Sequence, residues 1–143
     1  MTRLWIVRLG KYGEYEGRAL ETGELATGWS IRDLRTATTR EAVLAALQEA
    51  EPQEKLGTLQ NWAAQLNQLR NVMAAGDLVV TPLKTTGQLA IGRVVGDYLH
   101  FDDKHPGRKV EWLRKDVARE AVRQDLLFSL GASRTVCEVS RNE

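Results

Sequence analysis

The sequence predicts one domain of the α/β (α+β) class, and three observations lead to that prediction. Two apolar runs on either side of residues 85–87 predict a β-hairpin, because Thr-Thr-Gly supplies turn residues between them. Apolar residues at spacings of three and four over residues 59–74 predict an amphipathic helix immediately before the hairpin. The length of 143 residues, with 43% apolar and 27% charged residues, is typical of a single globular domain.

The hairpin is expected at residues 76–84 and 88–98. Pro82 ends its first run, or marks a strand edge where no amide donor is needed. Gly92 lies inside the second run, which indicates a bulge or the close approach of another chain segment.

The N-terminal part is expected to begin with a strand at residues 3–9 and a loop at residues 10–17. Three glycines and two tyrosines in this loop permit close backbone approach, so it is either a functional loop or a plain strand-to-helix connector. A short helix at residues 18–22 is expected to end at Gly23 as its C-cap.

Residues 24–31 are expected to contain a second short strand, which ends at Trp29. Thr38 and Glu41 form a capping box, which predicts the start of the next helix. The rest of the chain predicts a polar loop with a Pro-Gly turn, a strand, a helix and a last strand, at residues 99–107, 108–113, 119–130 and 135–139.

Composition limits the function classes. A net charge of +1 gives no global attraction for nucleic acid or membrane, so any such surface must be a local patch. The single Cys137 excludes an internal disulfide and is expected to be an inert thiol. His100 and His105 flank two aspartates, where a solvated loop is expected rather than a metal site. We find no catalytic motif and no signal or membrane-spanning segment, and therefore expect a cytoplasmic binding domain without catalytic residues, metal or cofactor.

Short motifs in a fixed order resemble two related groups of proteins. The first group is the N-terminal domain found ahead of the nuclease in Mrr-like restriction endonucleases. This chain resembles it at residues 5–8, 13–14, 21–29, 124–132 and 135–137. The second group is the EVE and YTH branches of the PUA superfamily. This chain resembles them at Asn61-Trp62, residues 73–77, residues 90–94 and the strand 109–113. The resemblance covers nearly the whole chain.

This resemblance implies a PUA-like curved mixed β-barrel flanked by helices, which flips a modified base out of DNA into an aromatic pocket. Aromatic side chains replace the stacking that a flipped base loses, at about 1–3 kcal/mol per contact. N6-methyladenine is the favoured base and a modified cytosine the second choice. Residues 1–143 are then one modified-DNA-binding domain and a fragment of a longer protein. That parent is expected to be a modification-dependent type IV restriction endonuclease with a C-terminal nuclease domain. This chain could then form a homodimer through its parent protein.

The resemblance also implies site residues. Trp29 falls where YTH-type domains place their first cage tryptophan, the alternative being a core residue. Glu14 is expected to accept a hydrogen bond from the base, and Asn61 to read its edge. The expected pocket residues are Trp29, Ser30, Tyr12, Tyr15, Glu14, Asn61, Tyr98 and Phe101. Those expected to contact DNA phosphates are Lys11, Arg18, Arg32, Lys84, Lys104, Arg108 and Lys109. Trp62 and Trp112 follow the apolar pattern and are expected in the core.

Two other functions are compatible with the same sequence. A small-molecule or nucleotide-sensing domain could use this pocket to gate an effector nuclease, and a protein-interaction domain could assemble a defence nuclease. The sequence leaves open which modification is read, whether the base is flipped, the flanking preference and the oligomeric state.

Overall fold

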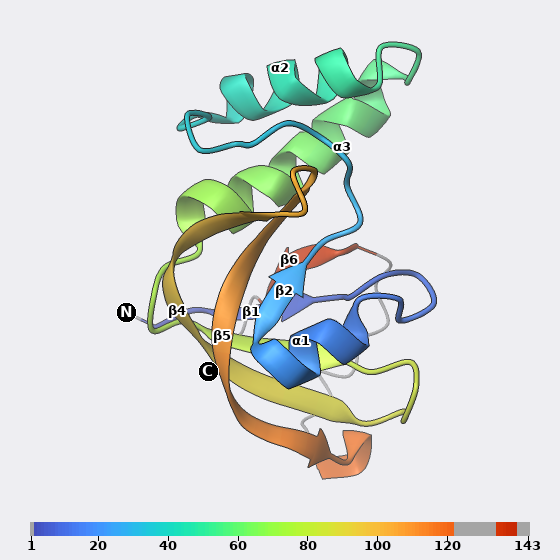
Figure 1. Ribbon diagram of the computed structural model, residues 1–143, viewed down its shortest axis with the longest axis vertical. Helices are drawn as coiled ribbons and strands as arrows, with labels where there is room; N and C mark the ends of the chain where they lie inside the picture. The colour runs from blue at the N-terminus through green and yellow to red at the C-terminus, as the bar shows by residue number, and fades with distance from the viewer. Residues whose placement is uncertain (1, 122–133, 140–143) are drawn as a thin grey trace.

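The computed structural model describes residues 2–121 and 134–139, which form a mixed α+β fold around one six-stranded sheet (Figure 1). The expected α+β class is confirmed. The strands in spatial order are β2 (Glu24–Ala26), β5 (His105–Val117), β4 (Leu89–Phe101), β3 (Leu78–Pro82), β1 (Leu4–Val7) and β6 (Val136–Glu138). Strands β1 and β3 are parallel, and the other neighbouring pairs are antiparallel.

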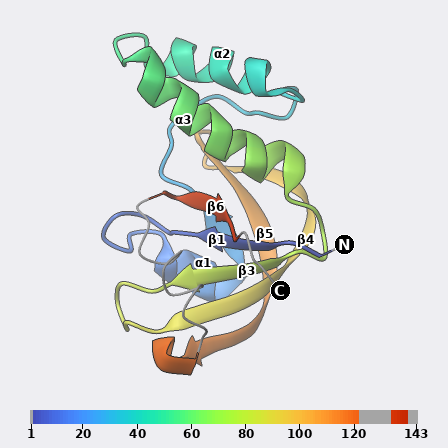
Figure 2. The same ribbon diagram turned by 180° about the vertical axis from the view of Figure 1, so that it is seen from behind.

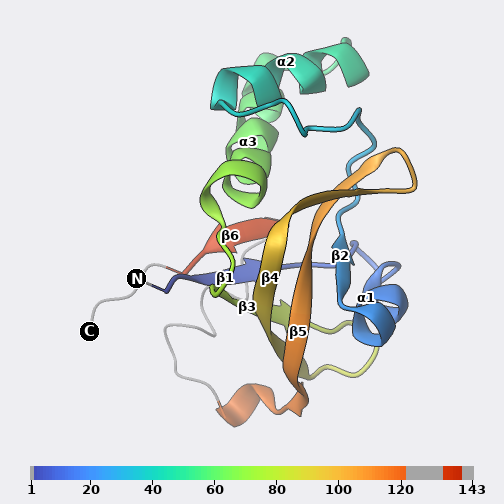
Figure 3. The same cartoon turned by 60° about the vertical axis from the view of Figure 1, so that its left-hand side comes forward.

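The sheet curves but stays open. Figures 1 and 3 show the long strands β4 and β5 bending across the molecule. Within the described residues, β2 pairs with β5 alone and β6 with β1 alone, so the closed barrel that the resemblance implied is not formed there. Both edge strands have three residues, which gives each of them few backbone groups for pairing across a closing seam.

The helices surround this sheet unevenly. Helices α2 and α3 pack together at one end of the molecule, while α1 lies beside the strands β2 and β5 (Figures 1 and 2). The helical elements are α1 (Glu16–Thr22), α2 (Arg40–Ala50), α3 (Leu56–Asn67), the π-helix η1 (Gln68–Val72) that continues α3, and the 3-10 turn η2 (Arg119–Ala121). Within the described ranges, no helix has the length and apolar character that crossing a bilayer requires.

The expected hairpin is confirmed as β3 and β4, with Val79 opposite Gly92. The β4–β5 register shifts between Ile91 and Gly92, as a bulge requires. A Cβ atom at Gly92 would lie 3.1 Å from both the Trp112 ring and the Val110 side chain. Glycine at this position therefore makes room for the side chains of the neighbouring strand.

Asp77, expected only as a turn residue, is a buried anchor for three segments. Its carboxylate accepts hydrogen bonds from the Trp5 Nε1–H (3.0 Å), the Ala74 N–H (3.0 Å) and the Arg3 N–H (3.2 Å). Burial on its own would raise the pKa of Asp77, but these hydrogen bonds outweigh burial and lower the pKa below its ordinary value. The bonds join β1 and β3 to the end of the α3–η1 helix.

The helix boundaries differ slightly from expectation. Gly23 caps α1 as expected, with a left-handed φ of 79°. The N-cap of α2 is Thr39 rather than Thr38, because the Thr39 hydroxyl accepts from the Ala42 N–H at 3.1 Å. Helix α3 begins earlier than predicted, and the five residues that follow it form the π-helix η1.

Two strand predictions are wrong in their bounds. Strand β2 ends at Ala26. The Thr27 N–H and hydroxyl both donate to the Pro106 carbonyl (3.0 and 2.7 Å), but Pro106 has no N–H to donate back and complete the pair. The polar loop at 99–107 is instead the tip of a β4–β5 hairpin, which turns at Asp102 and Asp103. These two residues have φ values of 56° and 58°, which aspartate tolerates better than most residues. Pro106 and Gly107 belong to β5.

The C-terminal predictions are partly outside the described residues. The final strand is confirmed as β6, and Cys137 in it is half-buried. The helix expected at 119–130 is described only as far as Ala121, where the chain forms a 3-10 turn.

The core has two parts on opposite sides of the sheet. The larger part joins the sheet to α2 and α3, and the smaller lies around Ile6, Val80 and Leu89. The largest fully buried side chain is Trp5, whose burial contributes stability roughly in proportion to the apolar area removed from water. This packing holds α3 in place above the sheet, and α3 supplies one wall of the site described next.

Candidate functional site

A cavity of about 580 Å³ lies between α3, the end of α2, and the segment that follows β2. We call it the tryptophan pocket, after Trp29 and Trp62. Its volume lies in the range of typical small-ligand sites. The lining residues are Gly28, Trp29, Ser30, Ile31, Leu47, Glu51, Asn61, Trp62, Gln65, Arg134 and Thr135.

Trp29 is positioned by the tip of the β4–β5 hairpin. The His105 Nδ1–H donates to the Trp29 carbonyl at 2.9 Å, and the Ile31 N–H donates to the Lys104 carbonyl at 2.9 Å. The Trp29 side chain is half-buried and packs against the edge of the core. Trp29 therefore both packs against the core and lines a cavity.

Tyr15 packs against His105, the residue that positions Trp29. Its ring lies 5.4 Å from the His105 ring at an interplanar angle of 59°, and His105 is the residue that bonds the Trp29 carbonyl. Tyr15 does not line the tryptophan pocket. It acts on the pocket through His105.

The side chain of Asn61 is oriented by a chain of hydrogen bonds that starts on the backbone. Gln65 is buried, and its Oε1 accepts from the N–H groups of Thr135 (2.9 Å) and Val136 (3.0 Å). Backbone N–H groups can only donate, so this atom must be the amide oxygen and the Gln65 Nε2 must be the donor. That Nε2 donates to Asn61 Oδ1 at 2.7 Å. The Asn61 Nδ2 group then remains as a donor with no partner among the residues the structure describes.

Trp62 was expected in the core, and the structure places it on the pocket wall as well. It is half-buried and packs against the main core cluster. Sequence reasoning also missed Glu51, Gln65 and Arg134 as lining residues. The sequence signal for this wall was the pair Asn61-Trp62, whereas Glu51 and Arg134 carry no local signal.

The pocket carries one carboxylate and one guanidinium, so its formal charges cancel. Glu51 Oε1 already accepts from Gln53 Nε2 at 3.0 Å, and a carboxylate can accept further bonds. The pocket therefore combines two indole rings, an amide donor at Asn61, a carboxylate acceptor at Glu51 and the exposed Ser30 hydroxyl. Such a set suits a flat ligand with both donor and acceptor atoms on its edge.

Four other expected pocket residues lie elsewhere. Tyr12 is 74% exposed, and its N–H donates to Glu14 Oε1 at 2.7 Å. Backbone hydrogen bonds from Glu14 itself and from Tyr12 lower the pKa of the Glu14 carboxyl. Phe101 is buried under the Arg18 guanidinium, 5.0 Å from the ring centre. Tyr98 lines a different cavity, where burial raises its pKa to about 12.

The residues expected to contact DNA phosphates differ in burial and in ion pairing. Arg108 is only 2% exposed and donates to the carbonyls of Leu69, Met73 and Gly96, so it stabilises the fold and is not a surface phosphate ligand. Arg32 pairs with Glu49 at 3.6 Å. The expected lysines are all exposed: Lys11, Lys84, Lys104 and Lys109.

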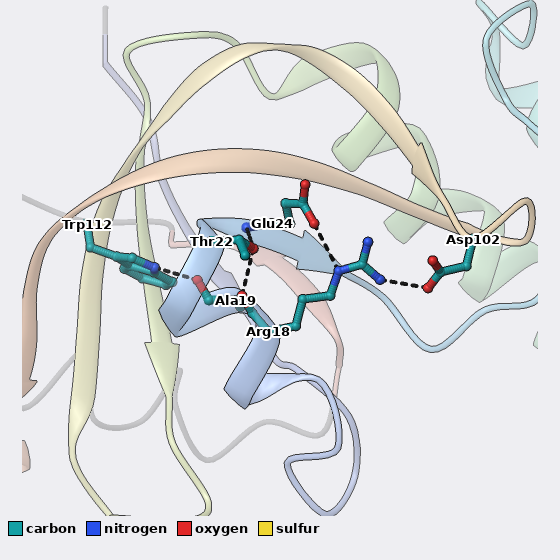
Figure 4. A network of polar contacts seen from close by, with 6 residues as sticks. All are labelled: Arg18, Ala19, Thr22, Glu24, Asp102 and Trp112. Carbon is teal, nitrogen blue, oxygen red and sulfur yellow. Dashed lines mark hydrogen bonds and ion pairs between the residues drawn. The ribbon is translucent and has the colours of Figure 1, made fainter.

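Arg18 is held by two carboxylates. It donates to Glu24 at 2.9 Å and to Asp102 at 2.6 Å, which ties α1 to the hairpin tip (Figure 4). The same view shows Trp112, whose Nε1–H donates to the Ala19 carbonyl at 2.7 Å. Trp112 is half-buried against the core, in agreement with its expected structural role.

No metal site is evident in the described part of the chain, where no three His, Cys, Asp or Glu side chains are grouped to hold an ion. His105, one of the two histidines considered for a metal, is buried and bonded to Trp29.

Comparison with known proteins gives one family and no characterised relative. No curated protein and no solved structure matches the chain. Residues 5–136 match the family model described as Domain of unknown function (DUF8426), so the chain belongs to that family.

Proposed function

We propose that this domain recognises a modified base in double-stranded DNA and binds it, flipped out of the helix, in the tryptophan pocket. N6-methyladenine is the favoured base, and a modified cytosine the second. In a longer parent protein this recognition would target a restriction nuclease module to modified DNA. The observation that carries the proposal is that Trp29, Trp62 and the oriented amide of Asn61 line one cavity of about 580 Å³.

The aromatic residues suit the energetics of base flipping. A flipped base loses its stacking partners, and a protein aromatic ring restores about 1–3 kcal/mol per stacked base. Trp29 and Trp62 are each partly exposed to the cavity, so their rings are available for this contact. A methyl group on the base gains further from apolar surroundings, which the indole rings and Leu47 provide.

The polar residues suit an amino base. The Asn61 Nδ2 donor matches a ring-nitrogen acceptor, and the Glu51 carboxylate matches the N–H of an exocyclic amine. Adenine and cytosine both place such an amine beside a ring nitrogen. Their N-methylated forms keep one N–H for Glu51 and add a methyl group for the indoles.

The exposed cations near the pocket provide weak, sequence-independent attraction to DNA. Lys104 lies beside the pocket through its bond to Ile31, and Arg134 lines the pocket itself. Because the net charge is only +1, we expect weak binding to unmodified DNA. Selectivity would then rest on the tryptophan pocket.

The test is a binding titration of matched duplexes that carry adenine, N6-methyladenine, cytosine, 5-methylcytosine or 5-hydroxymethylcytosine at one stated salt concentration. We expect at least tenfold tighter binding of one modified duplex, which corresponds to about 1.4 kcal/mol. Trp29→Ala should reduce this preference to near unity, and Tyr12→Ala, which removes an exposed aromatic ring outside the pocket, should leave it unchanged. Equal binding of all duplexes by the native protein would rule the proposal out.

A second candidate is a sensor of a free nucleoside or nucleotide that gates an effector nuclease. The cancelling charges of Glu51 and Arg134 favour it, because a neutral pocket gains little from a DNA backbone. Binding of a free modified nucleoside as tightly as of the matching duplex would support this second function.

A further inference from the structure

A second cavity of about 540 Å³ lies near the other end of the α3–η1 helix, against strand β4. It is lined by η1 and the segment that follows it, by β4 and by the segment before α2. We call it the arginine pocket, and its polar lining residues are Arg35, Arg70, Asn71, Asp97, Tyr98 and Arg108.

Arg108 lies on the buried side of this pocket. Its Nη1 donates to the carbonyls of Leu69 (2.9 Å) and Met73 (2.6 Å), and its Nη2 donates to the Gly96 carbonyl (2.7 Å). Its Nε is buried with no hydrogen-bond partner among the described residues. Burial lowers the pKa of Arg108, although the nearby charges of Asp97 and Asp77 oppose this effect. The guanidinium is therefore a buried cation that touches carbonyl dipoles and no carboxylate.

Arg70 is the more accessible cation. Its Nε donates to the Leu34 carbonyl (2.8 Å) and its Nη2 to the Arg35 carbonyl (2.6 Å). Its Nη1 has only a long contact of 3.4 Å to Asn71 Oδ1, which leaves donor capacity on this nitrogen. The guanidinium lies 5.4 Å from the centre of the Tyr98 ring, which holds its plane in place.

Several other arginines in the described ranges pair with carboxylates. In the described ranges, ion pairs to Asp or Glu are formed by Arg3, Arg18, Arg32, Arg35 and Arg114. Arg70 and Arg108 form none. The pocket thus contains three arginines and one carboxylate, Asp97, while Arg35 is shared with Asp33. Three guanidinium groups therefore lie around one cavity, and the nearby carboxylates are those of Asp33, Asp77 and Asp97.

We propose that the arginine pocket binds a phosphate-type oxyanion. Arg70 Nη1 and the Arg35 side chain would donate to its oxygens, and the buried charge of Arg108 would add attraction from behind. Guanidinium donors suit phosphate oxygens in both geometry and charge, and an anion there would lie beside two guanidinium groups that form no direct ion pair within the described ranges. The oxyanion could belong to a nucleic-acid backbone or to a free phosphate compound. The proposal does not rest on base recognition in the tryptophan pocket.

The test is an NMR titration of the ¹⁵N-labelled native chain with inorganic phosphate, compared with chloride at matched ionic strength. We expect saturable shifts of the Arg70 Nε–H and of the backbone amides of Ala74 and Ala75, which also line the pocket. Chloride should not produce them. Shifts that are equal for both anions, or that lie outside this pocket, would overturn the proposal.

Variants make the test specific. Arg70→Lys should weaken phosphate binding by at least fivefold, because lysine lacks the fork of donors. Arg114→Lys, at an arginine paired with Asp116 outside the pocket, is the matched control and should bind like the native chain. If Arg70→Lys fails to fold, Arg35→Ala replaces it, since the Arg35 side chain is 82% exposed and its loss should also weaken binding.

An unmodified DNA duplex distinguishes the two sources of the oxyanion. A duplex that shifts the same signals and competes with phosphate identifies a nucleic-acid backbone as the ligand. Phosphate binding that the duplex does not affect identifies a free phosphate compound. Because this duplex carries no modified base, the result is independent of the tryptophan pocket.

Discussion

The tryptophan pocket and the arginine pocket are built from the same two segments, yet their chemistry differs. The α3–η1 helix contributes Asn61, Trp62 and Gln65 to one and Arg70 to the other. The segment between β2 and α2 contributes Trp29 to one and Arg35 to the other. One pocket offers flat rings and neutral amides, and the other offers guanidinium groups. A free nucleoside should therefore bind to the first pocket with little dependence on salt, and an oxyanion should bind to the second with strong dependence.

Each pocket is lined by one buried structural residue and, next to it, one residue with unused hydrogen-bond donors. Gln65 and Arg108 are buried, and both bond to backbone groups distant in sequence. Next to them, Asn61 and Arg70 keep donors that no described residue uses fully. The comparison teaches that loss of a buried member should change stability, while loss of its neighbour should change binding.

The largest effect is expected for Arg108→Lys. Lysine cannot reach three carbonyls with one ammonium group, and each lost bond from a charged donor costs about 1.5–3 kcal/mol. We expect the free energy of unfolding in urea to fall by about 3 kcal/mol or more. Arg114→Lys, at an exposed arginine paired with Asp116, should change it by less than about 0.5 kcal/mol. Similar small losses in both variants would show that Arg108 is not the structural member of its pocket.

A smaller loss is expected for Gln65→Leu. The substitution leaves the N–H groups of Thr135 and Val136 without their acceptor, and an unsatisfied buried donor costs about 1–3 kcal/mol. Urea unfolding should show this loss, and Gln60→Leu, on the exposed side of the same helix, should not. Gln65→Leu also frees the Asn61 amide to rotate, so binding of the preferred base by this variant should weaken. Unchanged stability would contradict the hydrogen-bond chain that orients Asn61.

The smallest effect is expected for Tyr98→Phe and depends on pH. The Tyr98 hydroxyl accepts from the Leu34 N–H at 3.0 Å, so its removal should cost about 1 kcal/mol at neutral pH. Burial raises the Tyr98 pKa from 10.0 to about 12, so its contribution to stability is complete below pH 10 and is lost as the pH rises towards 12. The difference in unfolding free energy between native and variant chains should shrink over that range. A constant difference from pH 8 to 12 would contradict the assigned pKa.

Local sequence rules predicted the elements of this fold well. Turn chemistry and apolar runs located the β3–β4 hairpin, helical spacing located α3, and Gly23 was identified as the cap of α1. Errors arose where a distant partner competed with a local preference. Strand β2 stops early because its distant partner Pro106, 79 residues from Thr27, has no N–H to complete the pair. The expected closure into a barrel also depended on contacts between distant edges, and no local pattern reports on those.

The candidate site was predicted only in part, for the same reason. Trp29, Ser30 and Asn61 were predicted to share a pocket, and they do line one cavity. Tyr12, Glu14, Tyr98 and Phe101 were predicted there too, and the structure places them elsewhere. The expectation for Arg108 failed because a charged residue in a polar segment normally lies on the surface.

The sequence by itself determined the kind and order of the helices and strands as far as β5, the α+β class and the supply of aromatic and amide side chains near residues 29 and 61. Only the tertiary structure decided which buried polar groups meet. Gln65 finds its backbone partners 70 residues away, and Arg108 finds its own on η1 and β4. Helix and turn preferences act over a few residues, whereas the pairing of a buried donor depends on which distant backbone groups packing brings within 3 Å of it.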